Sequence, residues 1–326
     1  MIVTLTAEAD PAAVQRDLRG RGLWVRRMEA DGRVQFYVEP GSSRVSAGAV
    51  GGIEGVAAVA EPPSPHPRVD AQATAVAVGD VAIGGGREPV LMAGPCSVES
   101  EAQIHDVAER LAGLGVTFLR GGAFKTRTSP YAFRGRGEPA LRWLREAADA
   151  HGLKVVTEAL SPGQVPVLAR HADLIQIGSR NMQNSPLLEE ASAAGRPILL
   201  KRGMAATIDE WLLAGEHCLV SGAPGVVLCE RGIRSFDPRT RNLLDLGAVA
   251  LLGRVHGLPV IVDPSHATGR RDLLLPLSRA AVAAGAAGIM VETHPDPGSA
   301  LSDASQALPL EAFAELARAV RASGSS

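Results

Sequence analysis

Eight apolar segments of strand length recur between residue 76 and the C-terminus, and each is followed by a segment long enough to form a helix. They are Val90–Cys96, Thr117–Phe124, Lys154–Ala159, Asp173–Ser179, Pro197–Arg202, Gly225–Glu230, Pro259–Asp263 and Gly288–Glu292. Strands that are apolar at successive positions are typical of a parallel sheet buried on both faces. Eight such units in about 250 residues match a (β/α)8 barrel. We therefore predict an α/β fold with a TIM barrel over residues 76–326. A doubly wound sheet is the alternative, but the regular units lack its Gly-x-Gly-x-x-Gly opening.

The first 61 residues predict a separate small domain. Strand and helix patterns alternate there in the order β-α-β-β-α-β, over Ile2–Thr6, a helix starting at Asp10-Pro11, Leu23–Met28, Arg33–Val38, a weak helix over Ser43–Ala49 and Val56–Ala60. Asp31-Gly32 is a hairpin signal between the second and third strands. The order is that of a ferredoxin-like domain. We predict this domain over residues 1–61, a proline-rich linker over 62–75, and a hairpin of Val76–Val78 and Val81–Ile83 that closes the lower end of the barrel.

Composition argues against several classes of protein. A net charge of −2 and a pI near 6.5 do not suit a protein that neutralises nucleic-acid phosphates. The longest apolar run, Ala280 to Val291, contains two glycines and is shorter than the ~20 residues that span a bilayer. The acidic residues within Met1 to Asp10 do not resemble an export signal. Three cysteines are too few for a disulfide framework. We expect a cytoplasmic protein without nucleic-acid or membrane partners.

Charged residues follow the predicted strands, at the barrel end where TIM-barrel active sites lie. Five cations from four or five different strands must converge there: Arg120, Lys125, Arg180, Lys201 and Arg231. Like charges repel unless an anion lies among them, so we predict a site for a phosphorylated carboxylate. The Arg127-Thr128-Ser129 segment offers a second phosphate site. The alternative is a rim of ion pairs with Glu158, Glu230 and Asp263.

Lysine is scarce in this chain, which draws attention to the lysines that remain. Of 33 basic residues only Lys125, Lys154 and Lys201 are lysines. A position that keeps lysine in an arginine-rich chain is expected to need a compact ammonium group. Chance is the alternative explanation, but Lys125 and Lys201 both follow barrel strands. Lys154 begins a strand and is expected at the opposite end of the barrel.

A second group of residues has the chemistry of a metal shell. Cys96, His266, Glu292 and Asp303 follow the first, seventh and eighth predicted strands, and the first strand neighbours the eighth in a closed barrel. One thiolate, one imidazole and two carboxylates suit Mn, Fe, Co or Zn. The alternatives are a buried structural cysteine and a solvated aspartate, and His294 is a possible replacement for His266. Cys218 and Cys229 lie in helix and strand patterns and are expected in the core.

Several motifs resemble those of the 3-deoxy-D-arabino-heptulosonate 7-phosphate (DAHP) synthase family, in its short microbial branch. They are Ala93-Gly-Pro-Cys-Ser97, Arg120-Gly-Gly-Ala-Phe-Lys-Thr-Arg-Thr-Ser-Pro130, Gln176-Ile-Gly-Ser-Arg-Asn181, Leu200-Lys-Arg-Gly203, Leu228-Cys-Glu-Arg-Gly-Ile-Arg234 and Asp263-Pro-Ser-His-Ala267. The resemblance covers about residues 76–320. It implies condensation of phosphoenolpyruvate with erythrose 4-phosphate, the first step of the shikimate pathway, with release of phosphate. The N-terminal unit resembles the extension that some members use for feedback regulation, which implies an aromatic amino-acid effector and a homotetramer.

The resemblance also implies roles for individual residues. The metal ligands would be Cys96, His266, Glu292 and Asp303; phosphoenolpyruvate would bind Arg120, Lys125, Ser179, Arg180, Lys201 and Arg231; and erythrose 4-phosphate would bind Arg127, Thr128, Ser129 and Asp263. Lys125 would protonate or stabilise the forming alkoxide, and Glu158 would handle a water proton. Cys96 and His266 would belong to the catalytic centre as ligands of one divalent ion.

One position departs from the family. The loop usually reads Lys-Pro-Arg-Thr, and Thr126 replaces the proline here, which frees φ and adds an N–H. The tightness of aldose binding is therefore open. Two other functions compete: a 3-deoxy-manno-octulosonate 8-phosphate synthase, whose loop and metal cysteine usually differ, and an amino-acid-binding regulatory protein with an inactive barrel.

Overall fold

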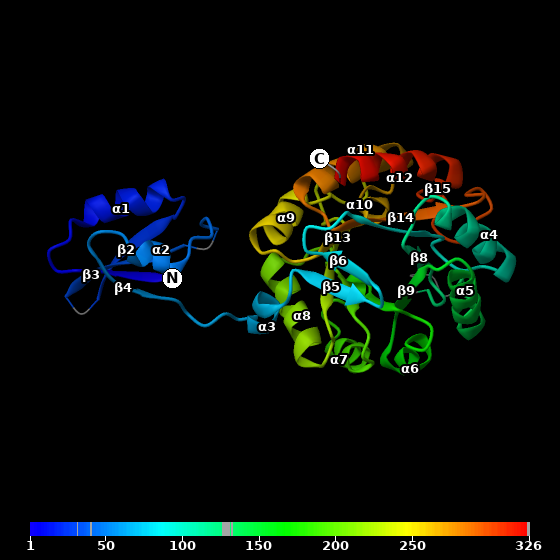
Figure 1. The fold of residues 1–326 in the computed structure, drawn as a ribbon, viewed down its shortest axis with the longest axis horizontal. Helices are drawn as coiled ribbons and strands as arrows, with labels where there is room; N and C mark the ends of the chain where they lie inside the picture. Colours follow the sequence, from blue (N-terminus) through cyan, green and yellow to red (C-terminus); the bar gives the residue numbers. More distant parts are fainter. Residues whose placement is uncertain (31, 40, 126–130, 132, 325–326) are drawn as a thin grey trace. The chain divides into compact units, whose positions relative to one another are not determined.

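The structure is a computed structural model that describes residues 1–30, 32–39, 41–125, 131 and 133–324 (Figure 1). The chain forms two compact units, Met1–Pro65 and His66–Ser326. Each unit has its own hydrophobic core, so each is described by itself.

The first unit has the predicted ferredoxin-like fold. Its elements are β1 (Ile2–Leu5), α1 (Pro11–Gly20), β2 (Val25–Ala30), β3 (Arg33–Val38), α2 (Ala47–Gly51) and β4 (Val56–Ala60), and the antiparallel sheet has the order β2-β3-β1-β4. Asp10 caps α1 by accepting the Ala12 N–H at 2.9 Å, as its sequence position predicts. Helix α2 begins later than the expected start at Ser43, because Ser46 caps it. Asp31 of the predicted turn lies outside the described residues.

The segment expected to be a linker differs from that expectation in its second half. Pro67–Ala71 forms helix α3, whose first N–H groups, those of Arg68 and Val69, donate to the carboxylate of Glu216 at 2.9–3.1 Å. The Gln72 amide exchanges two hydrogen bonds with the backbone of Val226. A carboxylate at a helix N-terminus is stabilising. Because these bonds join α3 and Gln72 to residues of the barrel, the residues from His66 onward belong to the barrel unit.

The second unit is the predicted (β/α)8 barrel. The parallel strands are β7 (Val90–Gly94), β8 (Phe118–Arg120), β9 (Lys154–Ala159), β10 (Leu174–Ile177), β11 (Ile198–Lys201), β12 (Val226–Glu230), β13 (Val260–Val262) and β14 (Gly288–His294). They pair in chain order, and β14 pairs with both β13 and β7, which closes the barrel. The surrounding helices in Figure 1 are α4 (Glu101–Ala112), α5 (Glu138–Ala150), α6 (Val165–Leu168), α7 (Ser185–Ala193), α8 (Ile208–Val220), α9 (Leu246–Ala250), α11 (Leu274–Ala284) and α12 (Leu310–Gly324).

The predicted hairpin plugs the amino-terminal end of the barrel. Strands β5 (Ala75–Val78) and β6 (Val81–Gly84) place Val76, Val78 and Ile83 in one buried cluster with side chains from inside the barrel strands. Lys154 Nζ lies 2.5 Å from Asp80 in the hairpin turn, which puts this lysine at the plugged end, as predicted. Only the opposite, carboxyl end remains for the polar site. Within the part of the chain that the structure describes, no helix is both long and apolar enough to cross a membrane.

Candidate active site

A polar cavity of about 290 Å³ opens at the carboxyl ends of the strands. Its lining residues are Arg120, Lys125, Glu158, Gln176, Gly178, Ser179, Arg180, Lys201, Met204, Arg231, Arg241, His266 and Asp303. All five predicted cations are among them. A cavity that gathers so many cations is suited to a ligand with more than one anionic group.

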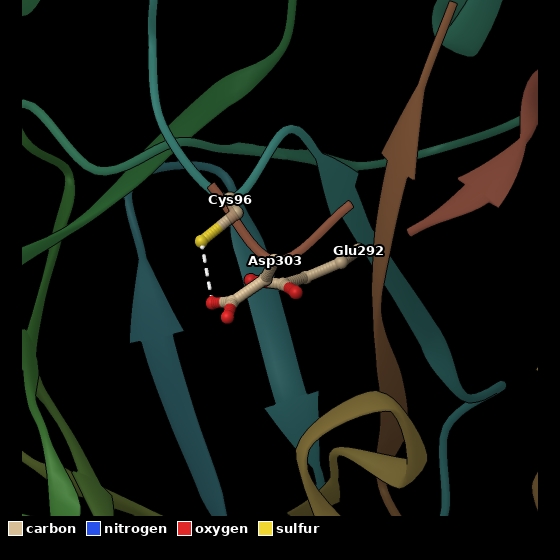
Figure 2. A group of neighbouring side chains, drawn as sticks. All are labelled: Cys96, Glu292 and Asp303. Carbon is tan, nitrogen blue, oxygen red and sulfur yellow. Dashed lines mark hydrogen bonds between the residues drawn. The ribbon is translucent and has the colours of Figure 1, made fainter. Parts of the chain in front are cut away.

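Of the four predicted metal residues, His266 and Asp303 line this cavity, and the buried Cys96 and Glu292 contact them. Ligand atoms of Cys96, Glu292 and Asp303 all lie within 4.8 Å of one another (Figure 2). The Cys96 thiol donates to Asp303 Oδ2 at 2.9 Å, and His266 Nε2 lies 3.2 Å from Glu292 Oε1. Burial, and then the Glu292 carboxylate, raise the pKa of the Cys96 thiol to about 12. Burial alone would raise the pKa of Glu292, but His266 and Arg120 hold it well below its usual range.

Arg120 is anchored between the Glu292 carboxylate and the backbone. Its Nη1 donates to Glu292 Oε1 at 3.0 Å and to the carbonyl of Pro95 at 2.8 Å. Arg120 is buried, and its Nε has no hydrogen-bond partner among the described residues. Gly94 allows the Arg120 backbone to lie close to β7, because a Cβ there would collide with the Arg120 carbonyl oxygen. An unpartnered buried N–H at the cavity is available to an anionic ligand.

Lys125 contacts Cys96, one of the predicted metal ligands. Its Nζ donates to the Cys96 carbonyl at 2.8 Å and lies 2.9 Å from Cys96 Sγ. Gly122 leaves the room for this contact, since a Cβ there would lie 2.9 Å from both the Cys96 carbonyl oxygen and Lys125 Cδ. A compact ammonium group therefore lies beside the thiol.

Asp263 is placed differently from the expected substrate contact. It is fully buried and is absent from the cavity lining; its Oδ2 lies 2.5 Å from Lys201 Nζ and 2.7 Å from His266 Nδ1. Its Oδ1 accepts the backbone N–H of His266 at 3.0 Å. Burial opposes ionisation, but His266 and Lys201 hold the pKa of Asp263 well below its usual range. Both oxygens are used inside the protein, so Asp263 orients other residues.

Glu158 also lines the cavity. Its Oε2 accepts from Gln176 at 3.1 Å, and Gly178 leaves room for the carboxylate, because a Cβ there would collide with it. Ser179 and Arg180 follow in a short 3-10 turn, Ser179–Asn181, directly after β10. The carboxylate of Glu158, the hydroxyl of Ser179 and the guanidinium of Arg180 are thus all part of the cavity lining.

The alternative of rim ion pairs describes part of this arrangement. Arg120 pairs with Glu292 and Lys201 with Asp263, whereas Glu230 pairs with Arg202, whose guanidinium also meets Asp245 at 2.9 Å. That last pair stands apart from the cavity lining. Arg231 instead donates to the His266 carbonyl at 2.9 Å, and burial lowers its pKa.

Other predicted residues lie outside the cavity or outside the described residues. His294 Nε2 lies 2.9 Å from the Gln103 amide and His294 does not join the Cys96 group. Cys218 and Cys229 are buried in the core, as predicted. Arg127, Thr128 and Ser129, together with Thr126, fall outside the described part of the chain.

Several residues of this region, Arg241 and Gln306 among them, were not predicted. Arg241, from the segment between β12 and α9, lines the cavity, and Gln306, which precedes β15 (Leu308–Pro309), contacts both Arg241 and Glu292. Neither belongs to a periodic pattern or follows a strand directly, so the sequence carries no signal for them.

Comparisons with known proteins bear on the family of the chain. The sequence profile of the DAHP synthetase I family matches residues 66–325. A phospho-2-dehydro-3-deoxyheptonate aldolase from Thermotoga maritima is 52% identical over 248 residues, covering 76% of this chain and 73% of that protein. A 2-dehydro-3-deoxyphosphooctonate aldolase from Rhodopseudomonas palustris is 35% identical over 268 residues, covering 76% and 92%. The crystal structure of a Thermotoga maritima DAHP synthase superposes with a TM-score of 0.76 at 43% identity, covering 97% of this chain and 95% of that one. A truncated form from the same organism covers 75% of this chain and 89% of that one, with a TM-score of 0.70 at 50% identity.

Proposed function

The chain belongs to the DAHP synthetase I family and catalyses the condensation of phosphoenolpyruvate with erythrose 4-phosphate to DAHP and phosphate, and we propose that this reaction takes place in the cavity of the barrel. The observation that supports this place most strongly is the set of five convergent cations beside a thiol and two carboxylates. Both substrates are phosphorylated, and the cavity offers positive charge for them.

We assign phosphoenolpyruvate to the wall formed by Arg120, Lys125, Ser179, Arg180, Lys201 and Arg231. Its phosphate and carboxylate would offset the mutual repulsion of these cations. One of these anionic groups would also accept a hydrogen bond from the unpartnered Nε of Arg120. Asp263 is assigned a positioning role in place of a direct substrate contact, since both of its oxygens are bonded. The aldose phosphate remains assigned to Arg127, Thr128 and Ser129 on the basis of the family motif.

We further propose that Cys96, His266, Glu292 and Asp303 hold one divalent ion. The residues fit such an ion, because the thiol of Cys96 and the carboxylates of Glu292 and Asp303 lie within 4.8 Å of one another, and the His266 imidazole lies 3.2 Å from Glu292. This donor set of mixed softness suits Mn, Fe, Co or Zn. The ion would supply Lewis-acid polarisation of an oxygen atom.

The protein side chains account for binding and proton movement. C3 of phosphoenolpyruvate forms a bond to the aldehyde carbon of the aldose, which leaves an alkoxide on the aldose and positive character at C2. Lys125 is placed to protonate or stabilise that alkoxide. A water adds to C2 and gives one proton to Glu158, which lines the cavity. The C2–O bond to phosphate then breaks while the new hydroxyl group loses its remaining proton to the departing phosphate, which gives the ketone and inorganic phosphate.

The test is a coupled assay with both aldoses. Phosphate release from phosphoenolpyruvate should require erythrose 4-phosphate, with arabinose 5-phosphate giving little or no turnover. The second aldose tests the octulosonate synthase alternative, which the 35% identical relative from Rhodopseudomonas palustris represents. Turnover with neither aldose would support an inactive barrel and contradict the proposed site.

We also propose that the ferredoxin-like unit binds an aromatic amino acid and thereby lowers activity. The notable support is its four-stranded sheet with a core of its own, attached to a barrel that does not need it for closure. We propose as well that the protein forms a homotetramer and is located in the cytoplasm.

A further inference from the structure

We infer that Gln306 is a positioning residue that joins the Glu292 carboxylate to the Arg241 guanidinium, so that the proposed metal group and the anion-binding wall are held as one unit. The inference rests on the proposed function, because it assigns Glu292 to the metal group. It adds two residues, Gln306 and Arg241, to the machinery of the site.

The side-chain amide of Gln306 uses both of its ends. Nε2 donates to Glu292 Oε2 at 2.5 Å, and Oε1 accepts from Arg241 Nη1 at 3.1 Å. Gln306 is 3% exposed, so water does not replace either bond. Its backbone N–H also donates to the Asp303 carbonyl at 3.1 Å, and Asp303 has a left-handed φ of 50°. A single residue therefore contacts two members of the proposed metal group and one cavity cation.

The Gln306 amide fixes the orientation of the Glu292 carboxylate. Glu292 Oε1 meets Arg120 and His266, and Oε2 is taken by Gln306. A neutral donor fixes the carboxylate plane without adding a further positive charge beside the Arg120 guanidinium and the His266 imidazole. An apolar side chain of similar size would leave a buried, charged oxygen without its partner, which is costly.

The same amide leaves the charge of Arg241 available. Among the described residues Arg241 makes no ion pair, and its bond to a neutral oxygen orients the guanidinium without neutralising it. The neighbouring Asn242 donates to the His266 carbonyl at 3.1 Å, the same oxygen that accepts from Arg231. Arg241 therefore lies next to the Arg231 part of the wall, where an anionic group of phosphoenolpyruvate is assigned.

The test compares Gln306→Met with a matched control, Gln72→Met. Gln72 also donates and accepts one hydrogen bond through its amide, but it contacts Val226 at the other end of the barrel unit. Titration of metal-stripped protein with Mn2+, followed by the electron paramagnetic resonance signal of free Mn2+, measures affinity without turnover. Gln306→Met should weaken binding roughly 10- to 100-fold, as loss of a partner of a metal ligand typically does, and Gln72→Met should not.

A second readout tests the link to Arg241. The KM for phosphoenolpyruvate should rise about tenfold in Gln306→Met and in Arg241→Met, on the order of one charge-assisted hydrogen bond, and the double variant should be little worse than either single variant. Unchanged Mn2+ affinity in Gln306→Met, equal weakening in Gln72→Met, or fully additive KM effects would each overturn the inference. Failure of the wild-type protein to form DAHP would contradict the proposed function, while the Mn2+ comparison would still decide the role of Gln306.

Discussion

Nδ1 of His266 lies 2.7 Å from Oδ2 of Asp263, and the other oxygen of Asp263 accepts the backbone N–H of His266. This contact directs Nε2 of His266 toward Glu292, 3.2 Å away. The same Asp263 oxygen lies 2.5 Å from Lys201 Nζ. One fully buried carboxylate thus orients both a proposed metal ligand and a cation of the proposed phosphoenolpyruvate wall.

Asp263→Asn should therefore impair both functions while leaving the barrel folded. The amide keeps the shape but removes the charge that holds Lys201 and fixes the His266 ring, so kcat/KM should fall at least about 100-fold. Steady-state kinetics and thermal unfolding together measure this. Asp245→Asn is the matched control, because Asp245 pairs with Arg202 outside the cavity lining. Similar losses in the two variants would contradict the orienting role.

Lys125→Arg should lose activity by about two to three orders of magnitude. The Lys125 ammonium lies 2.9 Å from Cys96 Sγ in a space that Gly122 leaves open, and a planar guanidinium does not fit a point-charge position. The measurement is kcat at saturating substrates.

Lys154→Arg is the control for the same substitution. Lys154 pairs with Asp80 at the plugged end of the barrel, where a guanidinium can also pair. The free energy of unfolding should therefore stay within about 0.5 kcal/mol of the wild-type value, and kcat should be nearly unchanged. Equal effects at both lysines would contradict the interpretation of lysine scarcity.

Removal of metal should abolish activity, and Mn or a similar ion should restore it. An ion that binds only the folded protein raises stability by about 2.7 kcal/mol at 100 times its Kd, so the melting temperature should rise on addition of the ion and fall with EDTA. Cys96→Ala should remove both responses.

The chain also supplies a control for incidental metal binding. Glu101, His105 and Glu146 form another group of ligand-type side chains, on the outer surface of α4 and α5. His105→Ala should leave the activity and its dependence on metal unchanged. Full turnover by metal-free enzyme would show that the Cys96 group is not a functional metal site.

The barrel could be predicted because its strands are apolar at successive positions, and that pattern depends only on burial of both faces of the sheet. The hairpin plug followed from the same pattern, and Val76, Val78 and Ile83 do fill the barrel end. The second half of the expected linker could not be predicted as a helix. Its stability comes from Glu216, which lies far along the chain and caps it.

The site could be predicted mostly where side chains lie at the carboxyl end of a strand or within a few residues of it. Arg120, Lys125 and Lys201 satisfy that condition and line the cavity. Gln306 and Arg241 lie in irregular segments whose path depends on tertiary contacts, so no spacing rule reaches them. The burial of Asp263 likewise depends on its tertiary contacts with Lys201 and His266. A position at the end of a strand does not by itself determine those contacts.

Deleting residues 1–65 should leave catalysis intact and remove inhibition by tyrosine or phenylalanine. The cut precedes α3, so the bonds of Arg68 and Val69 to Glu216 remain, and the barrel unit keeps its own core. Deleting residues 1–75 is the contrasting variant: it removes Val69, which is 4% exposed, and should cost about 1.5–3 kcal/mol from that side chain alone. Because a ligand shifts activity only through its different affinity for active and inactive states, inhibition must disappear with the domain that binds it. Dose–response curves for each aromatic amino acid on both proteins measure this. Equal sensitivity of the full chain and the 1–65 deletion, or no response from the full chain, would show that the ferredoxin-like unit is not the regulatory site.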